Sequence, residues 1–200
     1  MTFIGPDGAP RCDWAGGAPG FVEYHDTEWG FPVSDDVRLF EKFCLEGFQS
    51  GLSWRTILDK RENFRAAFAG FDLETVAGYD ESDVASLLQD AGIVRHRGKI
   101  EATINNAARA LELIETEGSL AAYVWRHEPD PAEVPVPQSL TTSPTATAMS
   151  KDLKKRGWKF VGPTTVFSFM EAMGLINDHT HDCVVRAQVD TARAAFVRPS

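Results

Sequence analysis

Apolar residues recur every three to four positions along most of the chain, which is the period of an amphipathic helix. Ser34-Asp35-Asp36 has the composition of an N-terminal cap, and apolar side chains follow it at positions 37, 40, 43 and 44. We expect Gly47 or Gly51 to end this helix and Ser53 to cap the next one. The same periodicity predicts helices over residues 54–58, 61–68, 81–89, 99–117, 120–126, 149–156 and 164–173.

No segment shows a persuasive strand alternation, so the sequence predicts an all-α protein. Residues 128–147 interrupt the helical pattern, because they contain five prolines, several Thr and Ser, and no periodicity. We expect a long surface loop or linker there, and a peripheral tail over residues 187–200. The 200 residues, 43% of them hydrophobic, are sufficient for a single globular domain.

The cysteine count and the apolar runs indicate the compartment. No apolar run approaches the ~20 residues of a membrane span, and the first residues do not have the pattern of a signal peptide. Three cysteines give no disulfide framework, which favours a reducing environment. We therefore expect a cytoplasmic protein with no membrane partner.

The net charge of −9 argues against a protein that coats nucleic acid without specificity. Two basic clusters nevertheless stand out, at residues 95–99 and 151–159. Each taken alone is typical of a solvated helix end or loop. Together, in an acidic chain, they leave room for a confined surface that binds phosphate.

Cys and His residues at the two ends of the chain have the composition of one metal site. Cys12 and His25 lie near the start, and His179 and Cys183 near the end. The last two are spaced i,i+4, which would place them on one face of a helix or helical turn. Two thiolates and two imidazoles form the ligand set of a closed tetrahedral zinc site, although His181 competes with His179 on spacing alone.

The third cysteine, Cys44, lies within an apolar helical run and is expected in the core.

The segment 155–165 joins two predicted helices through a glycine-containing turn. The first N–H groups of a helix have no partner within it, and such a turn presents them to a phosphate. Flanking Lys and Arg side chains add positive charge. Many connections between helices contain glycine, so this pattern alone indicates phosphate contact only weakly.

A second candidate site combines a carboxylate with aromatic residues. Glu46 and Trp54 flank a glycine-containing loop, and Tyr24 lies beside the candidate metal ligand His25. Aromatic rings and a carboxylate suit a flat, electron-poor heterocycle, which can stack on the rings and donate N–H bonds to the acid. The alternative is a core Trp54 and a surface Glu46 at a helix end.

Several unusual blocks resemble one family, the Tag type of DNA-3-methyladenine glycosylase I. The similarity spans about residues 11 to 185 and keeps the same order. The blocks are YHDTEWG (24–30), CLEGFQSGLSW (44–54), KRENF (60–64), QDAGIVRHRGKIEA (89–102), LKKRGWKFVGPTT (153–165) and GLINDH (174–179).

The resemblance implies a helix–hairpin–helix DNA glycosylase fold with two helical lobes around a base pocket. It also implies one zinc ion that joins the N- and C-terminal segments, held by positions matching Cys12, His25, His179 and Cys183. His179 is thereby chosen over His181. Four protein ligands leave no open coordination position, so this zinc is expected to be structural.

The resemblance also implies which residues hold the extruded base. Tyr24, Glu46 and Trp54 match the pocket positions, with Glu46 as the residue most closely tied to catalysis. Phe21 stands where the family can carry a further pocket tyrosine, and Phe48 replaces a polar residue found in some members. A carboxylate is expected to favour the charged alkylated base over neutral adenine.

The DNA contacts implied by the family fall in two loops. Gly51 and Leu52 match the tip that wedges into the stack vacated by the flipped nucleotide. The hairpin would grip the backbone phosphates. Its candidate contacts are Gly157, Lys159, Gly162 and Thr164.

These features predict a monomeric enzyme that hydrolytically excises 3-methyladenine from double-stranded alkylated DNA and releases the free base. No lysine is evident for Schiff-base chemistry, so a monofunctional glycosylase is expected. Asp178 lies near the place where related glycosylases carry a catalytic Asp, but its neighbour His179 makes a supporting role equally plausible. The alternatives are a noncatalytic lesion-binding homologue and a zinc-containing interaction domain.

Overall fold

The computed structural model describes residues 2–200, and helices make up most of the described chain. The α-helices are α1 (Phe21–Thr27), α2 (Asp36–Gln49), α3 (Trp54–Leu58), α4 (Arg61–Ala67), α5 (Leu73–Ala77), α6 (Glu81–Leu87), α7 (Arg97–Glu117), α8 (Leu120–Trp125), α9 (Pro144–Lys155), α10 (Pro163–Ala172) and α11 (Arg186–Ala195). Short 3-10 helices are η1 (Asp13–Gly16), η2 (Ala69–Phe71) and η3 (Pro131–Glu133). The expected all-α class is confirmed, with one small exception.

The exception is an antiparallel pair of strands, β1 (Thr2–Ile4) and β2 (Pro10–Cys12). Thr2 pairs with Cys12, and Ile4 with Pro10. Strands of three residues are too short to show an alternating pattern, so they could not be predicted from the sequence.

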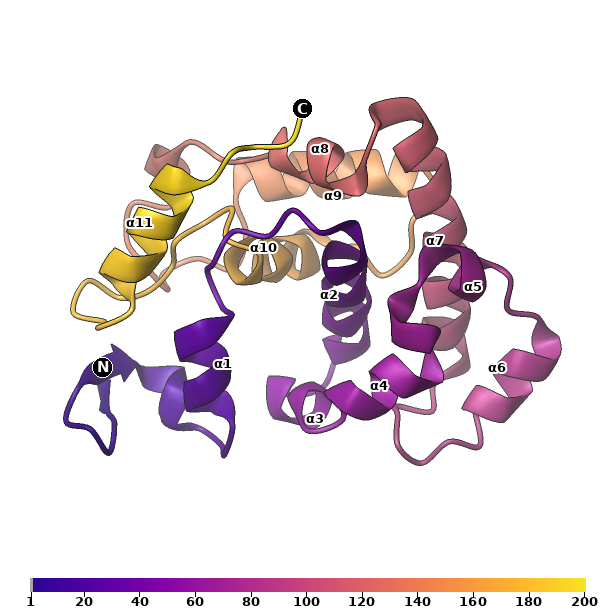
Figure 1. The fold of residues 1–200 in the computed structure, drawn as a ribbon, viewed down its shortest axis with the longest axis horizontal. Coiled ribbons are helices and arrows are strands. Elements are labelled where there is room, and N and C mark those ends of the chain that lie inside the picture. The colour runs from indigo at the N-terminus through magenta and orange to yellow at the C-terminus, as the bar shows by residue number, and fades with distance from the viewer. Residues whose placement is uncertain (1) are drawn as a thin grey trace.

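Helices α2 and α10 form the centre of the molecule (Figure 1). Phe43 of α2 and Phe169 of α10 stack with ring centres 3.6 Å apart. The expected cap of α2 is confirmed, because the Asp35 carboxylate accepts a hydrogen bond of 2.8 Å from the Arg38 N–H. Gly47 does not end the helix, which continues to Gln49 and stops before Gly51 with its φ of 79°.

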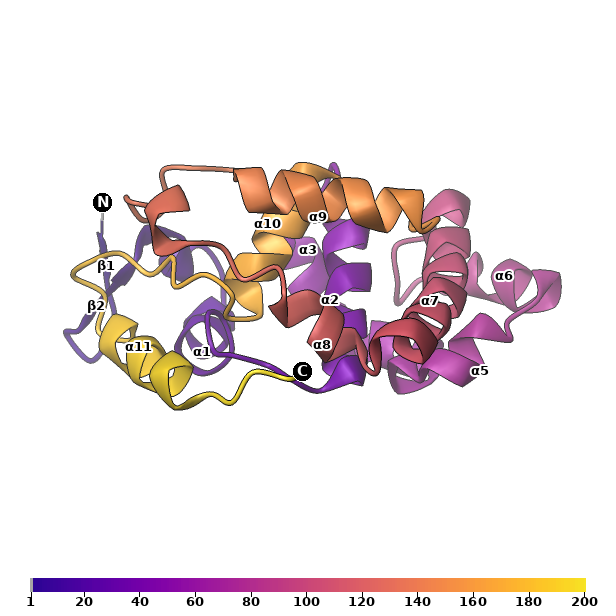
Figure 2. The ribbon, with the colours of Figure 1, turned by 90° about the horizontal axis from the view of Figure 1, so that it is seen from above.

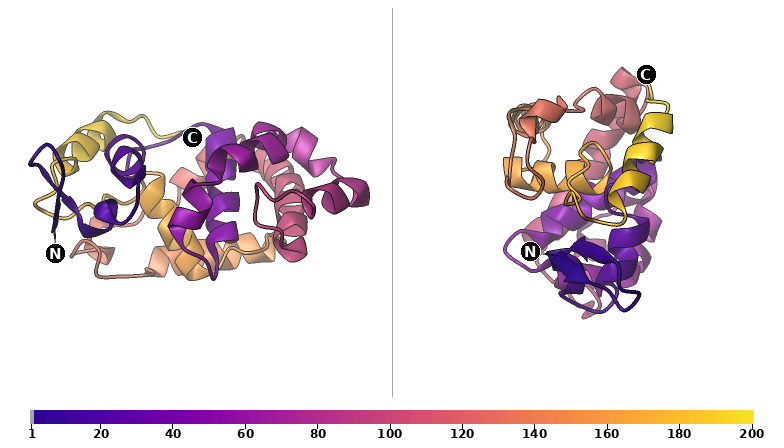
Figure 3. Two further views of the ribbon diagram at one scale, coloured as in Figure 1. Left: turned by 90° about the horizontal axis from the view of Figure 1, so that it is seen from below. Right: turned by 90° about the vertical axis from the view of Figure 1, so that its left-hand side faces the viewer.

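The N-terminal strands and helix α11 lie at one end of the molecule, and α4 to α7 lie towards the other (Figure 1). Figure 2 shows α11 beside α1 and the strands, and Figure 3 places the strands and α6 at opposite ends of the long axis. The Val184 N–H donates a hydrogen bond of 2.9 Å to the Pro10 carbonyl, which ties the C-terminal segment to β2. Within residues 2–200, no helix has the length and apolarity to cross a membrane.

Two expectations about irregular segments were wrong in part. The proline-rich segment 128–147 is not loop throughout, since η3 lies within it and α9 begins at Pro144 with Ser143 as its cap. The segment 187–200 contains most of α11, whose Val189 is fully buried. The start of α9 was missed because a proline at the first helical position resembles a loop in sequence. Helix α11 was missed because its apolar face is short and resembles a tail.

Gly174 joins α10 to the C-terminal segment, and a substitution there tests how tightly this connection is packed. Its φ is 81°, and a β-carbon there would lie 2.5 Å from the backbone of Phe31 and Pro32. We expect Gly174→Ala to destabilise the protein by about 2 kcal/mol or more, because both strain and a backbone clash oppose it. Chemical denaturation measures the effect. Gly118→Ala, with a similar φ of 88° and open space around it, is the control for strain alone.

Candidate active site and metal centre

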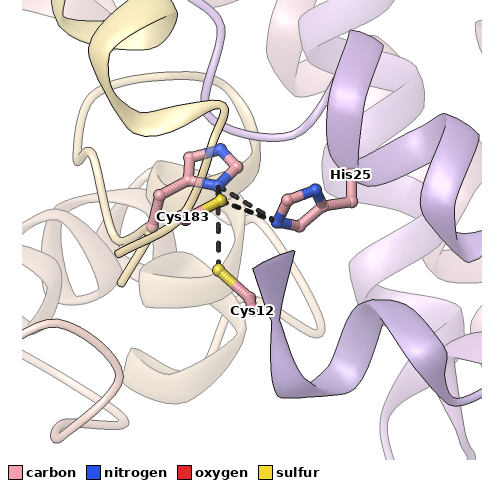
Figure 4. Close-up of side chains that lie close together, drawn as sticks. Cys12, His25 and Cys183 are labelled. Carbon is pink, nitrogen blue, oxygen red and sulfur yellow. Dashed lines mark hydrogen bonds between the residues drawn. The ribbon is translucent and has the colours of Figure 1, made fainter. Parts of the chain in front are cut away.

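Four buried ligand atoms converge where the N-terminal segment packs against residues 179–183. Cys12 extends from β2, His25 from α1, and Cys183 from the C-terminal segment (Figure 4). With His179 they form a group whose ligand atoms all lie within 4.8 Å of one another. The structure thus brings together distant residues such as Cys12 and His179, which are 167 positions apart.

The spacing of these atoms matches a tetrahedral ion. His25 Nε2 lies 3.2 Å from His179 Nδ1, and Cys183 Sγ lies 3.5 Å and 3.4 Å from the same two nitrogens. Cys12 Sγ is 3.7 Å from His179 Nδ1. A tetrahedral zinc ion with bonds of about 2.3 Å to sulfur and 2.0 Å to nitrogen separates its ligand atoms by about 3.3–3.8 Å. The donor set therefore fits a metal of this kind.

The second nitrogen of each histidine has its own acceptor. His25 Nδ1 lies 2.7 Å from Asp26 Oδ1, and His179 Nε2 lies 3.0 Å from the Trp29 carbonyl. Arg11 in turn donates to Asp26 through Nε and Nη2. Hydrogen bonds of this kind fix the ring orientation and direct the opposite nitrogen towards a metal.

The local structure around His179 and Cys183 differs from the expected helix. Both residues lie in an irregular segment, where the Cys183 N–H closes a turn on the Thr180 carbonyl. His181 is exposed and is not part of the group, whereas His179 is. Cys44 is buried in the core, as expected.

A cavity of about 320 Å³ lies next to this cluster. Its volume is in the range of sites for small ligands. The four residues that were predicted to hold the base all contribute to its lining. The lining is Trp14, Phe21, Tyr24, Trp29, Glu46, Gln49, Trp54, Gln138, Leu140, Ser168, Glu171 and Asp178.

Tyr24 and Trp54 form one aromatic wall of this cavity. Their ring centres are 5.3 Å apart with an interplanar angle of 43°. A flat ligand needs about 3.5 Å on each face, so in this arrangement it stacks on an edge or outer face and not between the two rings. Trp54 Nε1 is buried without a hydrogen-bond partner, which leaves one donor at the wall.

Glu46 is almost fully buried and forms an ion pair with Lys42 one helical turn earlier. The alternative of a surface acid at a helix end is therefore wrong for Glu46. A buried carboxylate is stable only with charged or hydrogen-bonding partners, and Lys42 supplies both. Glu46 thus presents an oriented acceptor to the cavity.

Two more carboxyl groups reach the same cavity. Asp178 accepts hydrogen bonds of 2.9 Å and 3.0 Å from the Gln138 N–H, so it holds the 128–147 segment against the site. Burial, followed by the neighbouring Asp178, raises the pKa of Glu171 well above its usual range. This shift favours the neutral form of Glu171, in which the carboxyl group can donate a hydrogen bond.

A second hollow of about 280 Å³ continues from the cavity towards the surface. It shares Glu46, Gln49 and Ser168 with the first. Gly51 and Leu52 line one side of it, and Thr164 of α10 the other. The Leu52 side chain is 42% exposed at this entrance. Two predicted DNA-contact elements therefore flank one entrance.

The turn between α9 and α10 is held rigidly by α7. Asn106 accepts from the Lys159 N–H at 2.8 Å and donates to the Lys159 carbonyl at 2.9 Å, while Asn105 donates to the Gly157 carbonyl. Gly157 has a φ of 85°, and Gly162 precedes α10 with no side-chain cap. The N–H groups at this helix start are free for another acceptor.

Lys99 fixes the other side of the entrance. Its buried ammonium donates to the carbonyls of Phe48 and Ser50 at 2.8 Å and 2.6 Å, which terminates α2 just before Leu52. We expect Lys99→Met to lower stability by about 1–3 kcal/mol and to weaken DNA binding, because two carbonyls lose their donor. Denaturation and fluorescence anisotropy with DNA measure these effects. Binding of a free base should be retained, and its loss in equal measure would contradict a role confined to the loop.

Sequence reasoning missed part of the site. The ion pair of Lys42 with Glu46 could have been predicted from their i,i+4 spacing. Gln138 and Leu140 come from the proline-rich segment, which the resemblance left out. Phe48, in contrast, is buried against Phe64 with ring centres 4.6 Å apart and does not line the cavity.

A sequence model described as methyladenine glycosylase matches residues 14–187. The chain belongs to this family. It is 49% identical over 177 residues to DNA-3-methyladenine glycosylase 1 of Escherichia coli, covering 86% of this chain and 95% of that protein. It is 43% identical over 177 residues to DNA-3-methyladenine glycosylase of Haemophilus influenzae, covering 86% of this chain and 96% of that protein.

Solved structures of such glycosylases share the fold. The structure of 3-methyladenine DNA glycosylase I (TAG) from Staphylococcus aureus, described as the basis of 3-methyladenine recognition, superposes with a TM-score of 0.83 at 39% identity. The match covers 88% of this chain and 95% of that one. The resemblance to Tag-type methyladenine glycosylases is thus confirmed over most of the chain.

Proposed function

We propose that the protein is a DNA repair enzyme that excises 3-methyladenine from alkylated double-stranded DNA. One observation carries this proposal: a buried, oriented carboxylate, Glu46, faces an aromatic cavity that opens between the Leu52 loop and the start of α10. A base must leave the DNA stack to reach such a cavity. The family supports the same reaction.

The cavity recognises the extruded base through stacking and hydrogen bonds. Methylation at N3 leaves the adenine ring positively charged, and Tyr24 and Trp54 gain cation–π attraction of about 0.5–2 kcal/mol each on contact with it. Glu46 accepts hydrogen bonds from the N–H groups of the base edge. Phe21 adds apolar contact and no hydroxyl.

The chemical step needs little from the protein, because the positively charged base is already a good leaving group. Water attacks C1′ of the sugar as the bond from C1′ to N9 breaks, and the bonding electrons neutralise the base. One proton is released, and free 3-methyladenine and an abasic site are the products. No lysine participates in this scheme, so the strand remains intact.

The α9–α10 unit serves as the helix–hairpin–helix that grips DNA. The free N–H groups before α10, together with Gly157, Gly162, Thr164 and the exposed Lys159, are suited to a backbone phosphate. Gly51 and Leu52 enter the gap left by the flipped nucleotide.

The metal held by Cys12, His25, His179 and Cys183 is one zinc ion. The two thiolates and two imidazoles favour zinc over harder cations, and four protein ligands leave no position for a reacting water. The ion therefore joins the termini and supports the wall that carries Tyr24, one residue before His25. It takes no part in the hydrolysis.

We propose that the protein acts as a monomer. None of the three cysteines is in a disulfide bond, which suits a reducing compartment such as the cytoplasm.

Release of free 3-methyladenine from methylated duplex DNA, separated from 7-methylguanine by chromatography, tests the proposed function. Selective release is the expected result. A folded, metal-loaded protein that binds the free base without releasing it from DNA would instead be a lesion-binding homologue. Absence of both binding and release would limit the similarity to the fold.

A further inference from the structure

Two basic segments, 95–99 and 151–159, differ from the rest of the chain in how their positive side chains are paired. Most Lys and Arg side chains contact a carboxylate or a carbonyl oxygen of the protein. The exceptions within residues 2–200 are all exposed, and they are Arg95, Lys151, Lys154, Lys155 and Lys159. In a chain with a net charge of −9, unpaired cations confined to two short segments point to an anion from outside the protein.

The three unpaired lysines of α9 share one face of that helix. Positions 151, 154 and 155 are spaced i, i+3 and i+4, so their side chains lie on the same side. Leu153, between them in sequence, is buried against the core. The lysines therefore form an exposed cationic ridge that leads into the turn before α10.

Acidic side chains are scarce around this ridge. Between residues 134 and 170, Asp152 is the only acidic residue. Its carboxylate accepts hydrogen bonds of 3.0 Å from Tyr123 Oη and 2.8 Å from Arg156 Nε. Its charge is therefore balanced within the protein, and a phosphate that approaches the lysines meets no free carboxylate from this stretch.

Contacts within the protein bring Arg95 to the two loops proposed to touch DNA. The ring of the neighbouring His96 lies edge to face with Phe160 of the α9–α10 turn, with ring centres 6.3 Å apart. Four residues after Arg95, Lys99 donates to the carbonyls that end α2 just before Leu52. Arg95 thus extends from a segment that is fixed against both the turn and the Leu52 loop.

An unpaired cation binds a phosphate more favourably than a paired one, because it has no ion pair to give up. Duplex DNA carries one negative charge per about 1.7 Å of its axis, whatever its sequence. Each phosphate that a cation neutralises releases counterions, so the affinity falls as salt is added. Cations spread over two elements of the fold suit such an extended polyanion better than a single small anion.

We propose that Arg95 and the exposed lysines of α9 bind the phosphates of undamaged duplex DNA, so that this surface holds the protein on DNA before any base is extruded. The inference rests on the proposed function, because it takes duplex DNA as the partner. None of these four side chains lines the cavity or its entrance. The surface therefore adds affinity that depends neither on the sequence nor on the damaged base.

The salt dependence of binding to an unmethylated duplex counts these contacts. Fluorescence anisotropy at several NaCl concentrations gives the slope of log affinity against log salt, which is about −0.9 for each phosphate contact with B-DNA. Arg95→Gln/Lys154→Gln should make this slope less negative by about 1.8 and weaken binding about tenfold or more near 0.1 M salt.

Arg126→Gln/Arg198→Gln is the matched control, because it removes the same charge from exposed positions elsewhere. Arg126 directly follows α8, and Figure 2 shows α8 and the C-terminus on the side of the molecule opposite α9. The acid that each of these arginines contacts keeps a second arginine partner. This variant should retain the wild-type slope. Thermal unfolding verifies that both variants are folded, as expected for substitutions at exposed positions.

A wild-type slope in Arg95→Gln/Lys154→Gln would overturn the proposal, and so would an equal change of slope in the control variant. The outcome is separable from that of the proposed function. A wild-type protein that releases 3-methyladenine from methylated DNA but does not bind the unmethylated duplex at low salt would overturn only this inference. Binding with the expected slopes but no release of the base would support the surface and overturn the glycosylase.

Discussion

Glu46→Gln is expected to reduce excision of 3-methyladenine by about a hundredfold or more. The amide keeps the shape of the side chain but loses the charge that pairs with Lys42, and it replaces one acceptor with a donor. Removing one member of a buried charged pair costs about 2–5 kcal/mol, most of it because the remaining charge is left unbalanced. In this site the unbalanced Lys42 also repels the cationic base.

Single-turnover release of 3-methyladenine from methylated DNA measures the loss, and titration with the free base shows whether binding falls with it. Glu41→Gln is the matched control, since Glu41 lies on the same helix and pairs with Arg65 outside the main cavity. Activity of Glu46→Gln within about threefold of the Glu41→Gln value would remove Glu46 from the reaction, because threefold corresponds to about 0.6 kcal/mol.

Cys183→Ser is expected to lose the metal ion and a large part of the stability together. A serine hydroxyl is a poor zinc ligand, and a three-ligand site opens to water. Because the ion joins β2, α1 and the C-terminal segment, its loss frees both ends of the chain. We expect a decrease of about 3 kcal/mol or more in the free energy of unfolding, and a fall of about 6–12 °C in Tm.

Elemental analysis of the purified protein and thermal unfolding measure the two effects. Cys44→Ser is the matched control, because Cys44 is equally buried but lies in the core away from the cluster. It should keep a full complement of zinc while losing some stability. A full zinc content in Cys183→Ser would refute the assignment of this ligand.

Local sequence determined most of the helices, because their caps and apolar stripes involve neighbouring residues. Asp35 and Ser53 cap α2 and α3 as expected, each through a hydrogen bond to a backbone N–H three residues later. Where the local pattern was short or ambiguous it failed, as in the three-residue strands and at the start of α9, where Ser143 and Pro144 lie in a proline-rich segment.

The sequence alone also determined the chemical identity of the site. The four candidate metal ligands and the proposed pocket residues Tyr24, Glu46 and Trp54 could be named without coordinates, since side-chain chemistry and the family resemblance are properties of the chain. Only the tertiary structure decided their surroundings. It buried Glu46 against Lys42, placed Gln138 on Asp178, and joined the cavity to the Leu52 loop. Burial and charge balance depend on contacts between distant segments, which no local pattern encodes.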